Sequence, residues 1–329
     1  MEFQPHADED PPAMTGGRVT RALQRSRRAR WLWLAAWLGA TALLLIFQRF
    51  DLAGVGRQLV RARPGWIGLA ALANFLVPLL LATLWARLLP AGRNVRWRKL
   101  AECSLLAFAA MNTLPLGGGH ALAIGLLSTS VGLGFDGAVS LMALEQLCEG
   151  GAKLSLLVLA LLAAPLPEGL RRAAWILGAG LIAGTAALLW VARHPRDVAS
   201  GWRARWSRHL EALLRPRVFA GAFGFALAIK LVELVAIWAV QRSLGVELPL
   251  ATVPVVLAAV SFATMISVAP ANLGVYEAAA FAAYRWFGVA PATAVALAVL
   301  HHACFLAPMV LPGYALTAWR AFSPRRPAN

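Results

Sequence analysis

The sequence predicts an all-α protein that crosses a membrane several times. Hydrophobic residues make up 60% of its 329 residues and charged residues only 14%, with a mean hydropathy of +0.66. A soluble domain usually carries about 25% charged residues. In addition, two long apolar segments, 105–127 and 260–284, are interrupted by proline and glycine at positions about 155 residues apart. These observations exclude a soluble globular protein.

Several apolar runs are long enough, or nearly so, to cross the roughly 30 Å of bilayer hydrocarbon. They are residues 31–47, 66–86, 154–167, 173–192 and 218–229, of which the third and fifth extend through a few charges, and the uncharged stretch 286–319. Tryptophans cluster near the ends of these runs, as in the interfacial belt of membrane proteins. They are Trp31, Trp33, Trp66, Trp97, Trp175, Trp190 and Trp319.

The two interrupted segments indicate a repeat. Pro115 and the glycines 117–119 break the first segment, and Pro270 and Gly274 break the second. Non-helical backbone at membrane depth is tolerated only where protein or a water-filled cavity satisfies its polar groups. Matching breaks in two halves indicate the binding site of an inverted-repeat transporter. We expect re-entrant hairpins at 100–133 and 251–288, six full spans, and eight hydrophobic segments in all.

The arginines set the expected topology. Six of them lie between residues 18 and 30, and seven lie within 193–217. Eight plain helices remain an alternative, but a simple crossing at 100–133 would place the 193–217 loop outside, against the positive-inside rule. The hairpins bring this loop and both termini to the cytoplasm.

The expected organisation follows from this topology. It consists of a disordered, basic N-terminus (1–30), a first membrane half (31–192), the basic loop (193–217), a second membrane half (218–320) and a tail (321–329).

Ionisable residues inside predicted spans are candidates for function, because they are costly in lipid. Glu145, Glu149 and Lys153 recur every four residues and therefore share one helix face. Lys230 and Glu233 lie within another predicted span. The alternative is that Glu149–Lys153 and Lys230–Glu233 are local ion pairs that hold helices together.

The repeat relates these residues to one another. Pro115 precedes Glu145 by 30 residues, and Pro270 precedes His301 by 31. Similarly, Asn74 precedes the first break by 41 residues and Lys230 precedes the second by 40. Both halves are therefore expected to direct polar groups at one central region.

Other classes of function lack support in the sequence. The net charge of +16 lies mostly in short loops beside spans, which argues against nucleic acid. His301 and His302 are adjacent, so their side chains diverge by about 100° on a helix, and no metal-ligand spacing accompanies them. Catalytic triads, a phosphate-binding glycine loop and a disulfide framework are also missing. We expect no enzyme, no metal and no cofactor.

At its motifs the chain resembles the lysylphosphatidylglycerol synthase transmembrane-domain family of flippase-like bacterial membrane proteins. That family shows an Asn, then Leu-Pro and a glycine-rich turn followed by an acid and an Arg. Asn112, Leu114-Pro115 and glycines 117–119 match, whereas His120 replaces the acid and Ala123 roughly the Arg.

Two further motifs extend the resemblance over about residues 30–320. The family's Glu-Arg-x-x-Asp resembles residues 145–149, with Gln146 in place of Arg. Its Pro-x-x-Gly-Leu-Gly-x-x-Glu resembles residues 270–277, shifted by one residue and short of one glycine, and ends at Glu277. A later Arg of the family is replaced at His301-His302.

The resemblance implies a multi-pass protein of the bacterial inner membrane that moves or handles a polar-headgroup lipid, anionic or aminoacylated. The alternative is an accessory or scaffold subunit for a lipid- or glycan-modifying enzyme. Membrane lipids are the expected partners, and a homo-oligomer is compatible with the sequence. The candidate binding residues are Asn112, Pro115, Gly118, Gly119, His120, Glu145, Glu149, Lys153, Lys230, Glu233, Pro270, Asn272, Gly274, Glu277, His301 and His302.

The topology can be tested by labelling. We expect a cysteine placed within 193–217 to react with a membrane-impermeant reagent only from the cytoplasmic side, because the hairpins return this loop there. Labelling of the loop from outside would contradict the hairpin topology.

Overall fold

The computed structural model describes residues 52–322, except 91, 115–117, 164–167, 194–209 and 266–269. The chain divides into two units, Met1–Phe50 and Asp51–Asn329, and all described residues belong to the second. Within the described residues every regular element is helical. The expectations for the N-terminus, the span at 31–47 and most of the basic loop lie outside the described residues.

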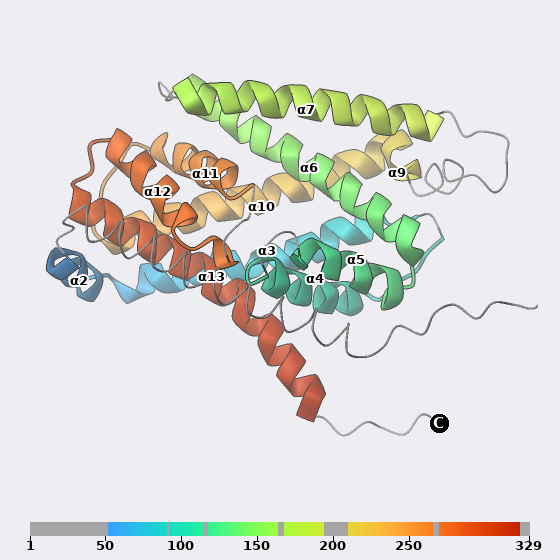
Figure 1. Ribbon diagram of the computed structural model, residues 1–329, viewed down its shortest axis with the longest axis horizontal. Helices are drawn as coiled ribbons and strands as arrows, with labels where there is room; N and C mark the ends of the chain where they lie inside the picture. Colours follow the sequence, from blue (N-terminus) through green and yellow to red (C-terminus); the bar gives the residue numbers. More distant parts are fainter. Residues whose placement is uncertain are drawn as a thin grey trace, which may run out of the picture. The chain divides into compact units, whose positions relative to one another are not determined.

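Five long helices, of 25 to 32 residues, form the framework (Figure 1). They are α3 (Pro64–Leu88), α6 (Gly134–Ala163), α7 (Glu168–Arg193), α10 (Pro216–Ser243) and α13 (Pro291–Phe322). At 1.5 Å per residue, 25 residues reach about 37 Å, more than the hydrocarbon thickness. Among the described residues, α3, α7, α10 and α13 contain stretches long and apolar enough to cross a membrane. This confirms a polytopic membrane protein.

Two pairs of short helices fall where the sequence is interrupted. The first pair is α4 (Trp97–Met111) with α5 (Gly118–Thr129), and the second is α11 (Thr252–Ala263) with α12 (Val275–Trp286). The members of each pair pack against each other. At 12 to 15 residues, each helix is too short to span a bilayer alone. That each pair enters and leaves the membrane on one side stays a prediction.

Three small elements complete the described chain. They are helix α2 (Leu52–Val60), the single turn α9 (Glu211–Leu214) and the 3-10 turn η1 (Pro270–Asn272).

The first interruption is shaped by close packing between α4 and α5. The side-chain amide of Asn112 donates a hydrogen bond to the Phe108 carbonyl at 2.9 Å, which satisfies a carbonyl in the last turn of α4. Gly119 lies so close to this turn that a Cβ atom there would overlap the backbone of Met111. Glycine is therefore required where α5 begins.

The second interruption depends on backbone conformation instead. Ala271, Asn272 and Gly274 have φ angles of 54°, 52° and 80°, in the left-handed region that non-glycine residues rarely adopt. Glu277 then caps α12, because its carboxylate accepts a hydrogen bond from the Gly274 N–H at 2.6 Å. This turn places Asn272 and Tyr276 beside the long helices.

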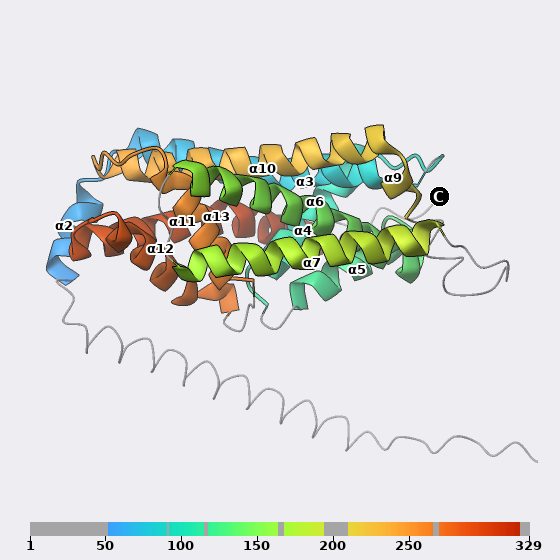
Figure 2. The ribbon, with the colours of Figure 1, turned by 90° about the horizontal axis from the view of Figure 1, so that it is seen from above.

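Helices α3 and α10 run antiparallel, side by side, and other helices pack against them (Figures 1 and 2). Helix α13 packs on α3 and α4, while α6 packs on α10 and α11. Helix α7 covers α6 and leaves apolar side chains such as Trp175 and Ile182 mostly exposed. Such side chains are suited to contact with lipid.

Helices α4 and α13 approach unusually closely. A Cβ atom on Gly313 would lie 2.5 Å from both the Ala109 Cβ and the Leu105 carbonyl oxygen. Further along the same contact, Thr113 and Tyr314 share a hydrogen bond of 2.9 Å between their hydroxyl groups. Two turns after Gly313, Arg320 of α13 forms an ion pair with Glu102 of α4.

The Gly119 contact gives a stability prediction. We expect Gly119→Ala to lower the free energy of unfolding by about 1–3 kcal/mol, because the added methyl group must separate α5 from α4. Gly125→Ala in the same helix is the matched control, since a Cβ there meets nothing within 4 Å. Thermal unfolding in detergent measures both. Equal stability of the two variants would contradict the close approach.

Candidate functional site

A network of four charged side chains lies between α6 and α10, with Lys230 buried and the other three partly buried. The Lys230 ammonium group is 3.0 Å from Glu149 and 2.9 Å from Glu233. Lys153, one turn after Glu149 on α6, completes the network at 3.8 Å from the same Glu149 oxygen. The two lysines and two carboxylates balance in charge.

Both local ion pairs considered as an alternative from the sequence are therefore present, and Lys230 joins them into one network. Each buried ion loses hydration that only its partners replace. Removal of a single member leaves an uncompensated charge, so the four residues act as a unit.

A second polar group joins α12 to α13. The Tyr276 hydroxyl lies 2.9 Å from Nε2 of His301. The ring of Tyr276 also stacks on His302, with ring centroids 4.2 Å apart. Nδ1 of His302 lies 2.6 Å from the Glu277 carboxylate. Thus Glu277 fixes the turn before α12 through Gly274 and the helix itself through His302.

Two more buried polar residues make contacts that link helices. The indole N–H of Trp85 in α3 donates a hydrogen bond of 2.7 Å to Glu145 in α6. The amide of Asn74 donates to the carbonyl of Cys304 in α13 at 2.9 Å. Glu145 is therefore held apart from the charge network, although it shares the helix face of Glu149.

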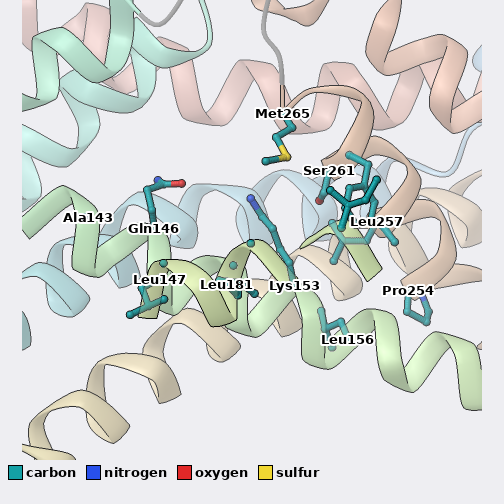
Figure 3. A pocket seen from close by; sticks show the side chains of 16 residues that line it. Ala143, Gln146, Leu147, Lys153, Leu156, Leu181, Pro254, Leu257, Ser261 and Met265 are labelled. Carbon is teal, nitrogen blue, oxygen red and sulfur yellow. The ribbon is translucent and has the colours of Figure 1, made fainter. Parts of the chain in front are cut away.

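Two cavities meet at Lys153. The smaller, of about 130 Å³, is polar and is lined by Lys230, Glu233, Asn272, Tyr276 and His301, among others. The larger, of about 570 Å³, is mostly apolar and lies between α6, α7 and α11. Lys153, Leu257 and Ser261 line both. Figure 3 shows Lys153 pointing from α6 into the space between Gln146, Ser261 and Met265.

The structure brings part of the predicted site together. Five predicted residues line the polar cavity, namely Lys153, Lys230, Glu233, Asn272 and His301. Glu149 binds both lysines, and Glu277 and His302 adjoin the cavity through Tyr276. Gly274 forms the turn before α12.

The remaining predicted residues lie elsewhere. Asn112, Gly118 and Gly119 shape the α4–α5 junction, and His120 is exposed on α5. Pro115 lies outside the described residues, and Pro270 begins the 3-10 turn. Glu145 lines neither cavity.

Sequence reasoning left Tyr276, Asn74 and Trp85 out of the site. Asn74 was already related to Lys230 by the repeat spacing, and Tyr276 directly precedes Glu277. Trp85 had a weaker signal, namely a tryptophan inside an apolar helix whose N–H requires a partner. Among the described residues, no group of three or more His, Cys, Asp or Glu could hold a metal ion.

Comparison with known families identifies the chain. Residues 32–313 match the family described as the lysylphosphatidylglycerol synthase TM region. The searches of curated proteins and of solved structures each gave no significant match. The match covers nearly the whole chain, in agreement with the resemblance noted in its motifs. The chain therefore belongs to the lysylphosphatidylglycerol synthase TM-region family and is an integral membrane protein tied to lipid metabolism.

Proposed function

We propose that this protein is a flippase-like transporter, not an enzyme, that moves a polar-headgroup lipid across the bacterial inner membrane. The observation that carries the proposal is the pair of cavities that meet at Lys153, one polar and one apolar. Ligand sites are mostly apolar with a few placed polar groups. A lipid has both parts in one molecule, so its headgroup and chains match the two cavities.

The packing of the helices supports an inverted repeat. The two halves place a long helix, a short pair and a second long helix in the same order, as α3–α4–α5–α6 and α10–α11–α12–α13. The last helix of each half packs on the first helices of the other half: α13 packs on α3 and α4, and α6 packs on α10 and α11. Antiparallel α3 and α10 would be related by an axis in the membrane plane, with the site near the midplane.

The second helix pair supports a re-entrant hairpin beside this site. Asn272 and Tyr276, at the turn between α11 and α12, line the polar cavity. Irregular backbone at membrane depth is expected where it borders such a cavity. The amino-terminal end of α12 also brings its positive dipole end to this side.

No nucleotide-binding motif occurs in the sequence, so we propose passive or proton-coupled movement. Glu149, Glu277 and the two histidines are the candidate proton carriers.

Variants of the charge network can distinguish a role in transport from a purely structural role. We expect Lys230→Met to abolish flipping of labelled phospholipids in vesicles and to lower the free energy of unfolding by about 3–5 kcal/mol, because two carboxylates lose their main partner. The double variant Lys230→Met with Glu149→Gln again has equal positive and negative charge in the network. We expect it to recover stability but not transport.

Recovery of both properties in the double variant would make the network structural only. Arg172→Met is the control, since its ion pair with Glu168 is mostly exposed. Such a pair contributes about 0–1 kcal/mol. A wild-type protein that flips no lipid would favour the accessory-subunit alternative instead.

Glu277 provides an independent prediction. We expect Glu277→Gln to reduce transport while the protein stays folded, because glutamine keeps the volume and can still accept the Gly274 hydrogen bond, but it loses the charge opposite His302. The flipping rate and the melting temperature are measured together. If Glu277→Gln fails to fold and the variants of the charge network leave transport unchanged, these charges contribute to stability alone.

A further inference from the structure

We infer that the transported lipid is a phospholipid with an uncharged, hydroxyl-bearing headgroup, and that its phosphate binds Lys153. The inference rests on the proposed function and specifies its substrate class. In this arrangement the acyl chains occupy the apolar cavity between α6, α7 and α11, and the headgroup occupies the polar cavity.

Of the two lysines in the network, Lys153 is the one that can bind a further anion. Lys230 is engaged by Glu149 at 3.0 Å and by both Glu233 oxygens at 2.9 and 3.0 Å, and its side chain is only 5% exposed. Lys153 has one contact with Glu149, at 3.8 Å, and its side chain is 37% exposed. An ammonium group has three N–H donors, so Lys153 can bind an incoming anion without breaking the network.

The position of Lys153 also matches that of a phosphate. It lies on the shared wall of the polar and apolar cavities, together with Ser261. In a phospholipid the phosphate occupies the corresponding place, between the glycerol-linked chains and the headgroup. Lys153 and the Ser261 hydroxyl thus offer a cation and a hydrogen-bond donor at the junction of the cavities, where the phosphate would lie.

The apolar cavity has open space for acyl chains along α7. Gly180 and Gly184 line it, and a Cβ atom on either would meet nothing within 4 Å. They are four residues apart and therefore lie on one face of α7. Leu257 and Phe262 of α11 line the cavity as well. The volume of about 570 Å³ is within the usual range for ligand sites.

The charges of the polar cavity disfavour a cationic headgroup. Each Glu233 oxygen already accepts a hydrogen bond from Lys230, so an amine of the lipid would have to share this carboxylate with the lysine. Lys153, whose contact with Glu149 is long at 3.8 Å, would also repel an ammonium group placed beside it. The cavity is small, at about 130 Å³, which suits a headgroup well below drug size.

Neutral groups in the cavity match hydroxyls instead. Asn272, Thr264 and His301 line it, and each can donate or accept a hydrogen bond. Nδ1 of His301 is buried without a hydrogen-bond partner among the described residues. A buried polar atom of this kind is stabilised by a ligand that supplies one. A glycerol headgroup would carry two such hydroxyls.

Binding to the purified full-length protein tests the inference. The probes are phosphatidylglycerol, phosphatidylethanolamine, lysyl-phosphatidylglycerol and diacylglycerol with identical chains, and inorganic phosphate, measured by native mass spectrometry. We expect phosphatidylglycerol to bind at least about tenfold more tightly than each of the others, because diacylglycerol lacks the phosphate, inorganic phosphate lacks the chains, and the two amine-bearing lipids add a cation near Lys153. Equal or tighter binding of either amine-bearing lipid would overturn the headgroup assignment.

Variants locate the two parts of the lipid. We expect Lys153→Met to remove the preference for phosphatidylglycerol over diacylglycerol and Lys153→Arg to retain it. Lys99→Met, at an exposed lysine outside the site, should match the wild type. Gly184→Leu should weaken binding of all the lipids, whereas Gly169→Leu, also on α7 but outside the cavity, should not. An unchanged preference in Lys153→Met would contradict the phosphate site.

Transport in vesicles distinguishes failure of this inference from failure of the proposed function. Flipping of lysyl-phosphatidylglycerol but not of phosphatidylglycerol would leave a flippase and overturn the substrate class. Lys153-dependent binding of phosphatidylglycerol without flipping of any lipid would retain the site and overturn transport. Competition by inorganic phosphate as strong as that by phosphatidylglycerol would indicate an anion site, not a lipid site.

Discussion

The burial of Lys230 is the constraint on which the site depends. Its ammonium group lies inside the helical assembly, and Glu149 and Glu233 supply the contacts that water would provide. Because Lys230 belongs to α10 and Glu149 to α6, the contact between them also fixes one helix on the other. Lys153 then takes its place at the junction of the cavities. The contacts of Lys230 thus neutralise its charge, hold α6 against α10 and set the position of Lys153 between the cavities.

The two halves use their corresponding regions differently. The second half has a cavity beside Tyr276 and His301, whereas in the first half Trp85 fills the space next to Glu145 and is completely buried. Under the proposed repeat, Glu145 and His301 are counterparts. One member of this pair is therefore sealed within the protein and the other faces a space that can hold a ligand. Of these two counterparts, only His301 therefore belongs to the candidate site.

Much of this architecture could be predicted from the sequence because its signals are local. Proline and glycine marked the helix ends near 112–119 and 264–274, and the four-residue spacing of Glu149 and Lys153 placed them on one face. The partners of single residues could not be predicted, since they depend on how distant helices dock. Nothing near Glu145 in the sequence points to Trp85, 60 residues away. For the same reason Asn112, which matches a family motif, and His120, which replaces its acid, were expected at a site whose cavities they do not line.

The contact between α4 and α13 restricts how the protein could move. Gly313 leaves no space between the two helices, and the Thr113–Tyr314 and Arg320–Glu102 contacts join them as well. Sliding one helix along the other would drive Ala109 or Leu105 into a neighbouring side chain. Helices α4 and α13 therefore form a closely packed pair that joins the first half to the second. We therefore expect any change in access to the cavities to leave α4 and α13 together and to involve the helices that line the larger cavity, α6, α7 and α11.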